Sequence, residues 1–157
     1  MTLPARVFKV ENKLAKVVRL PGGRTVAEAI GSADKRIAGV KDVCISAMQE
    51  RVRRLAGLAE SGRAGTARVL DEIYATANEI LGLAGSFQMT ELGQAASSLC
   101  DITDAFREGA PVSWPAIDVH VDGLRMLSVE ACKPDDRQRI LIGLLKVRSR
   151  FIANAEA

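Results

Sequence analysis

Apolar residues recur every three or four positions through most of the chain after residue 24, and this spacing is what most restricts the fold. It is the period of an amphipathic α-helix, in which residues three, four and seven apart share one face. Aromatic residues make up only 4% of the chain. That composition also favours helices, because strands draw on aromatic and β-branched side chains. The sequence therefore predicts an all-α fold.

Turn and capping residues divide this pattern into segments. Thr25, with Glu28 three residues later, has the spacing of a capping box and predicts the start of a long helical stretch. That stretch is expected to end near Ser61-Gly62 and to break near Gly39, leaving a short helix before a long one. Four further helices are predicted, over about 66–87 and about 90–107, after Ser113, and after the break at 133–136. Thr90 is expected to cap the second of these helices. Short connections make consecutive helices antiparallel neighbours, so we expect an up-and-down bundle.

Length and charge suggest one domain with a basic arm. The 157 residues are expected to form a single helical domain over 25–157, preceded by an extended arm over 1–24. The whole chain has a net charge of +3, whereas residues 1–24 hold six basic residues against one acidic residue, or +5. The arm is interpreted as a solvated tail or as a contact for an acidic partner or a membrane surface. We expect a cytoplasmic protein, because no apolar run approaches the roughly 20 residues of a membrane span.

The residue types of common active sites are scarce. Cys44, Cys100 and Cys132 are widely spaced, and His120 is the single histidine, which argues against a metal site. No glycine-rich nucleotide loop follows a strand pattern, and paired carboxylates do not gather at apolar positions. We therefore expect no enzyme activity, no cofactor and no metal.

One stretch, Glu72 to Gly85, has two contrasting faces. An apolar stripe on one side consists of Leu70, Ile73, Ala77, Ile80 and Ala84. The other side carries Asn78, Leu81, Gly82 and Gly85. A glycine inside a helix costs about 1 kcal/mol relative to alanine, and a common compensation is close approach by another surface. This face is therefore predicted to dock against a partner.

His120 lies beside the apolar stripe that Ile117, Val121 and Leu124 form in the segment after Ser113. A lone histidine in such a place is usually a partly buried, hydrogen-bonded packing residue, which is the interpretation we favour. The alternative is that His120 accepts a phosphoryl group or orients a group of a partner.

Residues 78–92, which read NEILGLAGSFQMTEL, are followed by AASSLC at 95–100. Together with HVDGLR at 120–125, this pattern resembles the histidine phosphotransfer (Hpt) family, over roughly 65–150. The resemblance implies an antiparallel four-helix bundle, here with an extra N-terminal helix. It also implies phosphoryl exchange with aspartates of receiver domains through an exposed histidine, a basic residue three positions later and a glycine after that.

The sequence departs from the family pattern at both chemical positions. Asn78 stands at the place of the phosphoaccepting histidine, and Leu81 at the place of the basic residue. An amide nitrogen is a poor nucleophile, and Leu81 cannot neutralise a phosphoryl group. The resemblance therefore implies a degenerate member that binds a receiver domain or a histidine kinase without relaying phosphate. The expected partner-binding residues are Tyr74, Asn78, Glu79, Leu81, Gly82, Gly85 and Gln88.

Three alternatives remain open from the sequence. One is phosphotransfer through His120. Another is a nucleic-acid or membrane-surface binder that uses the arm with Arg51, Arg53 and Arg54, although no aromatic platform accompanies these charges. The third is a helical interaction module in which the long helix from Val26 to Leu58 packs against a second copy, giving a weak homodimer in place of a monomer.

Overall fold

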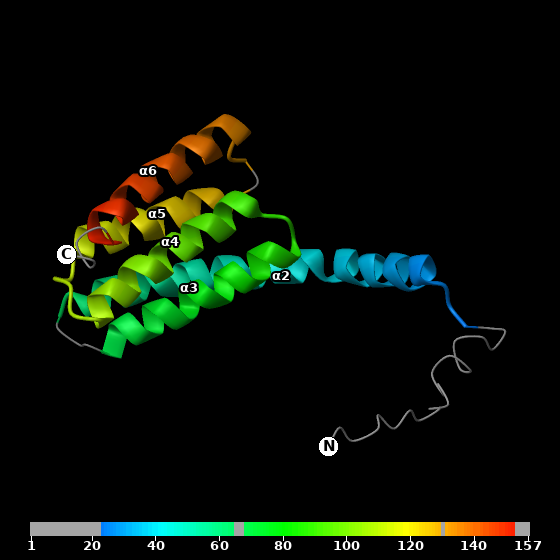
Figure 1. Ribbon diagram of the computed structural model, residues 1–157, viewed down its shortest axis with the longest axis horizontal. Coiled ribbons are helices and arrows are strands. Elements are labelled where there is room, and N and C mark those ends of the chain that lie inside the picture. The colour runs from blue at the N-terminus through cyan, green and yellow to red at the C-terminus, as the bar shows by residue number, and fades with distance from the viewer. Residues whose placement is uncertain (1–22, 65–67, 130, 153–157) are drawn as a thin grey trace, which may run out of the picture. The chain divides into compact units, whose positions relative to one another are not determined.

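The computed structural model describes residues 23–64, 68–129 and 131–152, and within them every regular element is a helix. The helices are α2 (Val26–Gly62), α3 (Arg68–Ser86), α4 (Thr90–Arg107), α5 (Trp114–Leu127) and α6 (Pro134–Ile152), as Figure 1 shows. The predicted all-α class is confirmed over this part of the chain. The predicted arm falls almost wholly on residues 1–22, which lie outside the described residues. By its internal contacts the chain divides into two units, residues 1–39 and 40–157.

The capping box at the start of α2 is present. The backbone N–H of Thr25 donates to Glu28 Oε2 at 2.7 Å, and the backbone N–H of Glu28 donates to Thr25 Oγ1 at 3.2 Å. The first hydrogen bond lowers the pKa of the Glu28 carboxyl. Two of the amide groups that a helix start leaves without helical partners are thereby satisfied.

The predicted break near Gly39 is wrong, because α2 is assigned as one helix from Val26 to Gly62. The segment expected as a separate N-terminal helix is therefore the first part of α2. A glycine weakens a helix by about 1 kcal/mol but keeps its backbone N–H and C=O groups, so it need not interrupt the hydrogen bonding. The predicted end of this helix near Ser61-Gly62 is confirmed, because α2 ends at Gly62.

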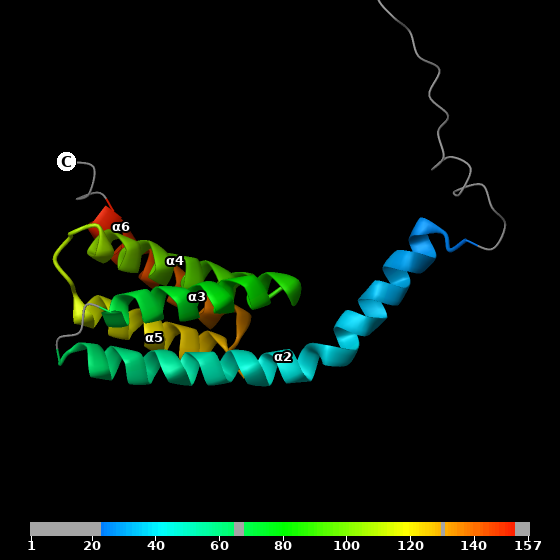
Figure 2. The same ribbon diagram turned by 90° about the horizontal axis from the view of Figure 1, so that it is seen from below.

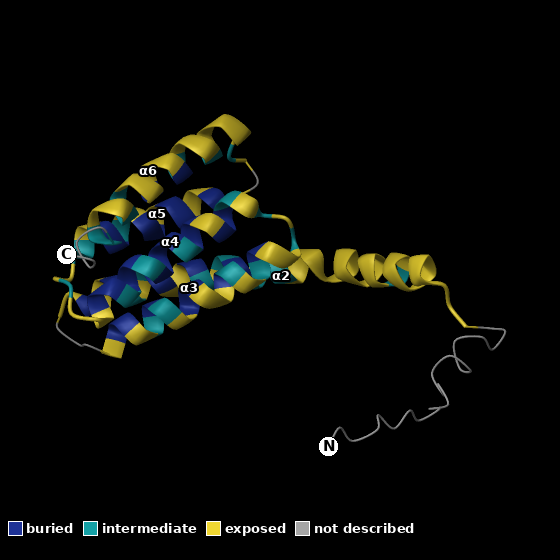
Figure 3. Ribbon diagram, viewed as in Figure 1, coloured by how far each residue is buried: buried dark blue, intermediate teal, exposed yellow. Residues whose placement is uncertain are grey.

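The second unit has one apolar core. Its buried side chains come from the later part of α2 and from each of α3, α4, α5 and α6. Figure 3 shows dark blue, buried segments on the inner sides of these helices and exposed residues on their outer sides. Fully enclosed core side chains include Met48, Leu55, Ile73, Leu99 and Leu124.

Ion pairs at the edges of the core show how the helices run. Arg107, the last residue of α4, pairs with Asp71 in the first turn of α3 at 2.7 Å, so these two helices are antiparallel. Arg51 of α2 pairs with Glu79 of α3 at 2.6 Å, so residues from the middle of α2 lie beside the middle of α3. Figure 2 shows the helices of this unit lying lengthwise along one another.

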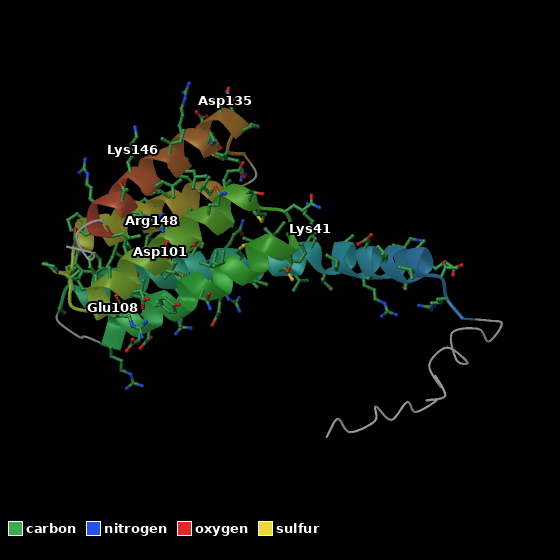
Figure 4. All side chains as sticks on the ribbon, in the orientation of Figure 1. Lys41, Asp101, Glu108, Asp135, Lys146 and Arg148 are labelled. Atoms are coloured by element: carbon green, nitrogen blue, oxygen red, sulfur yellow. The ribbon has the colours of Figure 1, made fainter. Side chains whose placement is uncertain are left out.

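Helix α6 lies along α4 and also contacts α5. Arg148 of α6 and Asp101 of α4 point toward one another and form an ion pair (Figure 4). One turn farther along both helices, the rings of Phe106 and Phe151 meet edge to face with centroids 5.3 Å apart. Since the residue numbers rise together along both helices, α6 runs parallel to α4.

Close packing at Gly62 gives a test of this core. A Cβ added to Gly62 would lie 2.1 Å from Trp114 Cη2, so Gly62→Ala forces the indole ring to move. We expect this change to lower the free energy of unfolding by about 1–3 kcal/mol, the usual cost of overpacking. Gly57→Ala on the same helix is the matched control, because nothing lies within 4 Å of its added Cβ. The control should stabilise the protein by about 0.5–1 kcal/mol. Urea denaturation followed by circular dichroism measures both, and equal effects would contradict the described packing.

Candidate functional site

Helix α3 separates its two faces as the sequence predicts. The stripe of Leu70, Ile73, Ala77, Ile80 and Ala84 is buried throughout. On the other side Asn78, Gly82 and Gly85 are exposed and Leu81 is half-buried. We call these last four residues the α3 surface.

The glycines of the α3 surface are not explained by packing within the chain. A Cβ added to Gly82 or Gly85 would meet no heavy atom within 4 Å. By contrast, Gly123 on α5 lies where a Cβ would come within 2.8 Å of Leu144. Open space by itself is not distinctive, since Gly143 on α6 also has it. What distinguishes Gly82 and Gly85 is that both accompany a half-buried leucine and an exposed amide on one side of one helix.

A hollow of about 260 Å³ adjoins the α3 surface where α3 turns into α4. Leu81, Gly85 and Gln88 line it from α3 and the turn. The residues that line it from α4 and its start are Met89, Thr90, Gly93 and Gln94. The sequence predicted Leu81, Gly85 and Gln88 as surface residues but did not predict the residues of this second set. Gly93 was a sequence feature that could have indicated close packing of α4 on α3. In the structure a Cβ at Gly93 would lie 3.5 Å from Ala84 Cβ.

The turn beside the hollow has a special backbone. Gln88 has a φ of 57°, which lies in the left-handed region that residues other than glycine rarely adopt. The N–H of Met89 donates to the carbonyl oxygen of Ala84 at 3.0 Å, which closes the end of α3. Thr90 was expected to cap α4, but Met89 occupies the cap position and makes no side-chain cap bond. Helix α4 nevertheless runs from Thr90 to Arg107, in agreement with the bounds that the sequence predicts.

Two of the expected partner-binding residues are already engaged inside the chain. The guanidinium of Arg107 lies 5.0 Å from the centroid of the Tyr74 ring, and Tyr74 is half-buried. Glu79 forms its ion pair with Arg51, although its side chain remains 52% exposed. These residues therefore lie at the edges of the α3 surface, where a partner would meet them beside groups of the chain itself.

His120 is a buried core residue, in agreement with the packing role that its place in the stripe favours. Its side chain is 0% exposed. Nδ1 lies 2.8 Å from the carbonyl oxygen of Ala116 and Nε2 lies 2.8 Å from Ser98 Oγ. The carbonyl can only accept, so Nδ1–H donates to Ala116 and Nε2 accepts from the Ser98 hydroxyl. Burial lowers the pKa of His120, which favours this neutral form.

The burial of His120 and Ser98 argues against group transfer at this pair. A serine hydroxyl beside an imidazole nitrogen is the pair found in many hydrolases, but Ser98 is only 1% exposed. A substrate or a phosphoryl donor would have to open the core to reach either residue. The geometry therefore favours a structural role for both.

Metal-ligating and thiol groups do not converge in the part of the chain that is described. Among those residues, no three His, Cys, Asp or Glu side chains are placed to hold a metal ion. Burial, followed by the charges of Asp101 and Asp104, raises the pKa of the Cys100 thiol to about 11, so this thiol stays protonated. Over the same residues, no helix combines the length and the apolar character needed to cross a membrane.

The pKa of His120 predicts a pH dependence of stability. Its pKa is about 6.5 in the unfolded chain and lower in the folded protein, so the unfolded state binds more protons between these values. The contribution of neutral His120 to the free energy of unfolding should therefore be complete above about pH 6.5. It should fall by up to about 1.4 kcal/mol for each pH unit below that value. Urea denaturation of wild type and His120→Gln at pH 7.5 and 5.5 measures this difference. A wild-type decrease no larger than that of the variant would contradict the assignment.

Comparison with known proteins identifies no relative. No protein-family model, no curated protein and no solved structure matches the chain. The resemblance to the Hpt family therefore depends on the residues quoted for it in the sequence, chiefly 78–100.

Proposed function

We propose that this chain is a non-catalytic signalling adaptor of a bacterial two-component or phosphorelay system, located in the cytoplasm. In this proposal the α3 surface docks onto a receiver domain or a histidine kinase, and position 78 relays no phosphate. The observation that carries it is the joint exposure of Asn78, Gly82 and Gly85, with open space where a Cβ would stand at each glycine. The protein would then be a degenerate Hpt protein.

We propose further that the second unit is an antiparallel four-helix bundle of Hpt type. The sequence predicted the extra helix at the N-terminus, but that segment is part of α2. In this proposal the later part of α2 with α3, α4 and α5 would form the four helices, and the additional helix would be α6, packed on α4 and α5. Support comes from the antiparallel α3 and α4 and from pairs that connect α2 with both α3 and α5. One is Arg54 with Glu72 at 3.5 Å, and another joins Gln49 to the carbonyl oxygen of Ser128 at 3.4 Å.

The chemistry of the α3 surface suits contact without transfer. Asn78 offers an amide that can donate and accept hydrogen bonds, but its nitrogen lone pair is delocalised and cannot form the phosphoramidate that an imidazole forms. Leu81 adds apolar area and no charge, so a phosphoryl group arriving here would find no neutralising cation. The α3 surface would therefore provide contact area for a partner but would not stabilise a bound phosphoryl group.

The shape of the surface favours a partner that comes close to the helix backbone. With hydrogen atoms at Gly82 and Gly85, a facing helix or loop approaches α3 about as nearly as its own side chains allow. The adjoining hollow at Gly85 and Met89 is apolar enough to accept one aliphatic side chain. We expect a modest affinity, since transient signalling contacts are often smaller than about 1,200 Å² in total.

A bulky charge on the glycine face tests the proposed docking. Gly82→Arg should abolish binding to the cognate protein in a panel of purified receiver domains and histidine kinases from the organism that encodes the chain. Gly143→Arg introduces the same side chain at a glycine of α6 that also has open space around it, and it should leave binding unchanged. Biolayer interferometry measures the affinities, and circular dichroism confirms that both variants are folded. If Gly82→Arg binds as well as wild type, or if wild type binds no member of the panel, the proposal is wrong.

A gain of function tests the geometry at position 78. Asn78→His together with Leu81→Lys restores a nucleophilic imidazole and a cation on the exposed side of α3. Incubation with a phosphorylated receiver domain should then give an acid-labile phosphohistidine, whereas wild type stays unlabelled. The matched control combines Glu91→His with Leu81→Lys. It places the histidine on α4 in place of α3 and should also stay unlabelled. Labelling of wild type that is lost in His120→Ala would instead support phosphotransfer through His120.

A further inference from the structure

Helix α4 has a narrow accessible line between α3 and α6. Over the residues that the structure describes, α4 packs against both helices, whereas α3 and α6 do not lie against each other (Figure 1). Most of α4 is buried. In its middle Gln94 is exposed, and Ser97 and Asp101 are half-buried. A surface that contacts both α3 and α6 must therefore cross this line of α4.

Two hollows adjoin the accessible line of α4. The first is the hollow at the turn from α3 into α4, which Gln94 also lines. The second has a volume of about 300 Å³ and lies between α4 and α6. Its lining residues are Gln94, Ser97, Ser98 and Asp101 of α4 and Leu145 and Arg148 of α6. Because Gln94 lines both hollows, they join into one groove that crosses α4 obliquely from Gly85 to Leu145. We call it the α4 groove.

The α3 surface by itself is too small to hold a partner protein. Even a weak signalling contact of about 1,200 Å² in total covers about 600 Å² on each protein, which takes more than four residues. The interface must therefore extend beyond α3 on one side. We infer that it extends over the α4 groove and that one amphipathic helix of the partner lies in this groove. This inference rests on the proposed function, since it concerns the partner that docks on the α3 surface.

Charge argues against an extension on the other side, over α2. Between α2 and α3 lies a hollow of about 540 Å³ that is lined by charged residues of both helices. The ion pairs at this hollow are Arg51 with Glu79, Arg53 with Glu50, and Arg54 with Glu72. A partner that covered the hollow would remove these pairs from water, and the desolvation cost can exceed the attraction that is gained.

The chemistry of the α4 groove suits an uncharged helix face. Among the described residues that line it, the charged side chains are Asp101 and Arg148, and these two pair with each other (Figure 4). The first hollow is mainly apolar, and Leu145, which is 39% exposed, gives the second hollow an apolar wall. Gln94 offers hydrogen bonds between them. A complementary face carries one aliphatic side chain for each hollow and a polar residue between the two.

Backbone hydrogen bonding explains why the partner's element is a helix. The N–H and C=O groups of α4 are engaged within that helix, so the groove has no free edge to which an extended segment could add backbone hydrogen bonds. A helix satisfies its own backbone and presents only side chains. Along α4 the lining residues run from Thr90 to Asp101, which is a rise of about 16 Å. A helix of about three turns covers this length, with two aliphatic anchors about seven residues apart.

Binding by variants of the groove tests the inference. Leu145→Arg places a charge in the second hollow, and Gln94→Arg places one where the hollows join. Each should weaken binding to the partner found in the panel of receiver domains and histidine kinases by about tenfold or more. Val119→Arg on α5 is the matched control, because Val119 is 49% exposed and lines neither hollow, and it should bind as wild type does. Biolayer interferometry measures the affinities, and circular dichroism verifies that the variants fold.

The outcomes separate this inference from the proposed function. If Gly82→Arg abolishes binding while Leu145→Arg and Gln94→Arg bind as wild type does, the proposed function holds and the inference is wrong. If wild type binds no member of the panel, or Gly82→Arg still binds, both are wrong. Arg53→Gln removes a charge on the α2 side and should leave the affinity unchanged. A loss in Arg53→Gln as large as that in Leu145→Arg would place the partner over α2 and overturn the inference.

Discussion

The close contact between α3 and α4 is the constraint on which the rest of the second unit depends. Small residues meet where the helices approach, since a Cβ at Gly93 of α4 would lie 3.5 Å from Ala84 Cβ of α3. The contact fixes the rotation of α3 about its axis, because Ile73, Ala77 and Ile80 must all face the core. Once that side is buried, Asn78 and Gly82 can only face outward. The candidate docking surface is thus a geometric consequence of the core.

Most of this fold was accessible from the sequence, because local signals and burial agree. The 3.6-residue period of the α3 stripe predicted which residues are buried, and Thr25 with Glu28 predicted the start of α2 to the residue. The errors arose where one local signal was weighed without its surroundings. Gly39 was read as a break, although glycine keeps the helical hydrogen bonds. Thr90 was expected to cap α4, although Met89 occupies the cap position and Thr90 is the first helical residue.

The candidate site was predictable in its centre and not at its edges. One helix defines the α3 surface, so its periodicity alone places Asn78, Leu81, Gly82 and Gly85 together. The hollow also needs α4, and which residues of a second helix line it depends on the packing distance between the two. The cation over Tyr74 and the ion pair of Glu79 likewise join residues that are 33 and 28 positions apart, so single-helix patterns do not contain them.

The composition of the α3 surface decides the kind of contact that its residues support. The two glycines leave the helix backbone open to a facing surface, and Asn78 can both donate and accept hydrogen bonds. Leu81 adds apolar area, and none of the four residues carries a charge. A partner at this surface would therefore be selected by its shape and its hydrogen bonds more than by its charge.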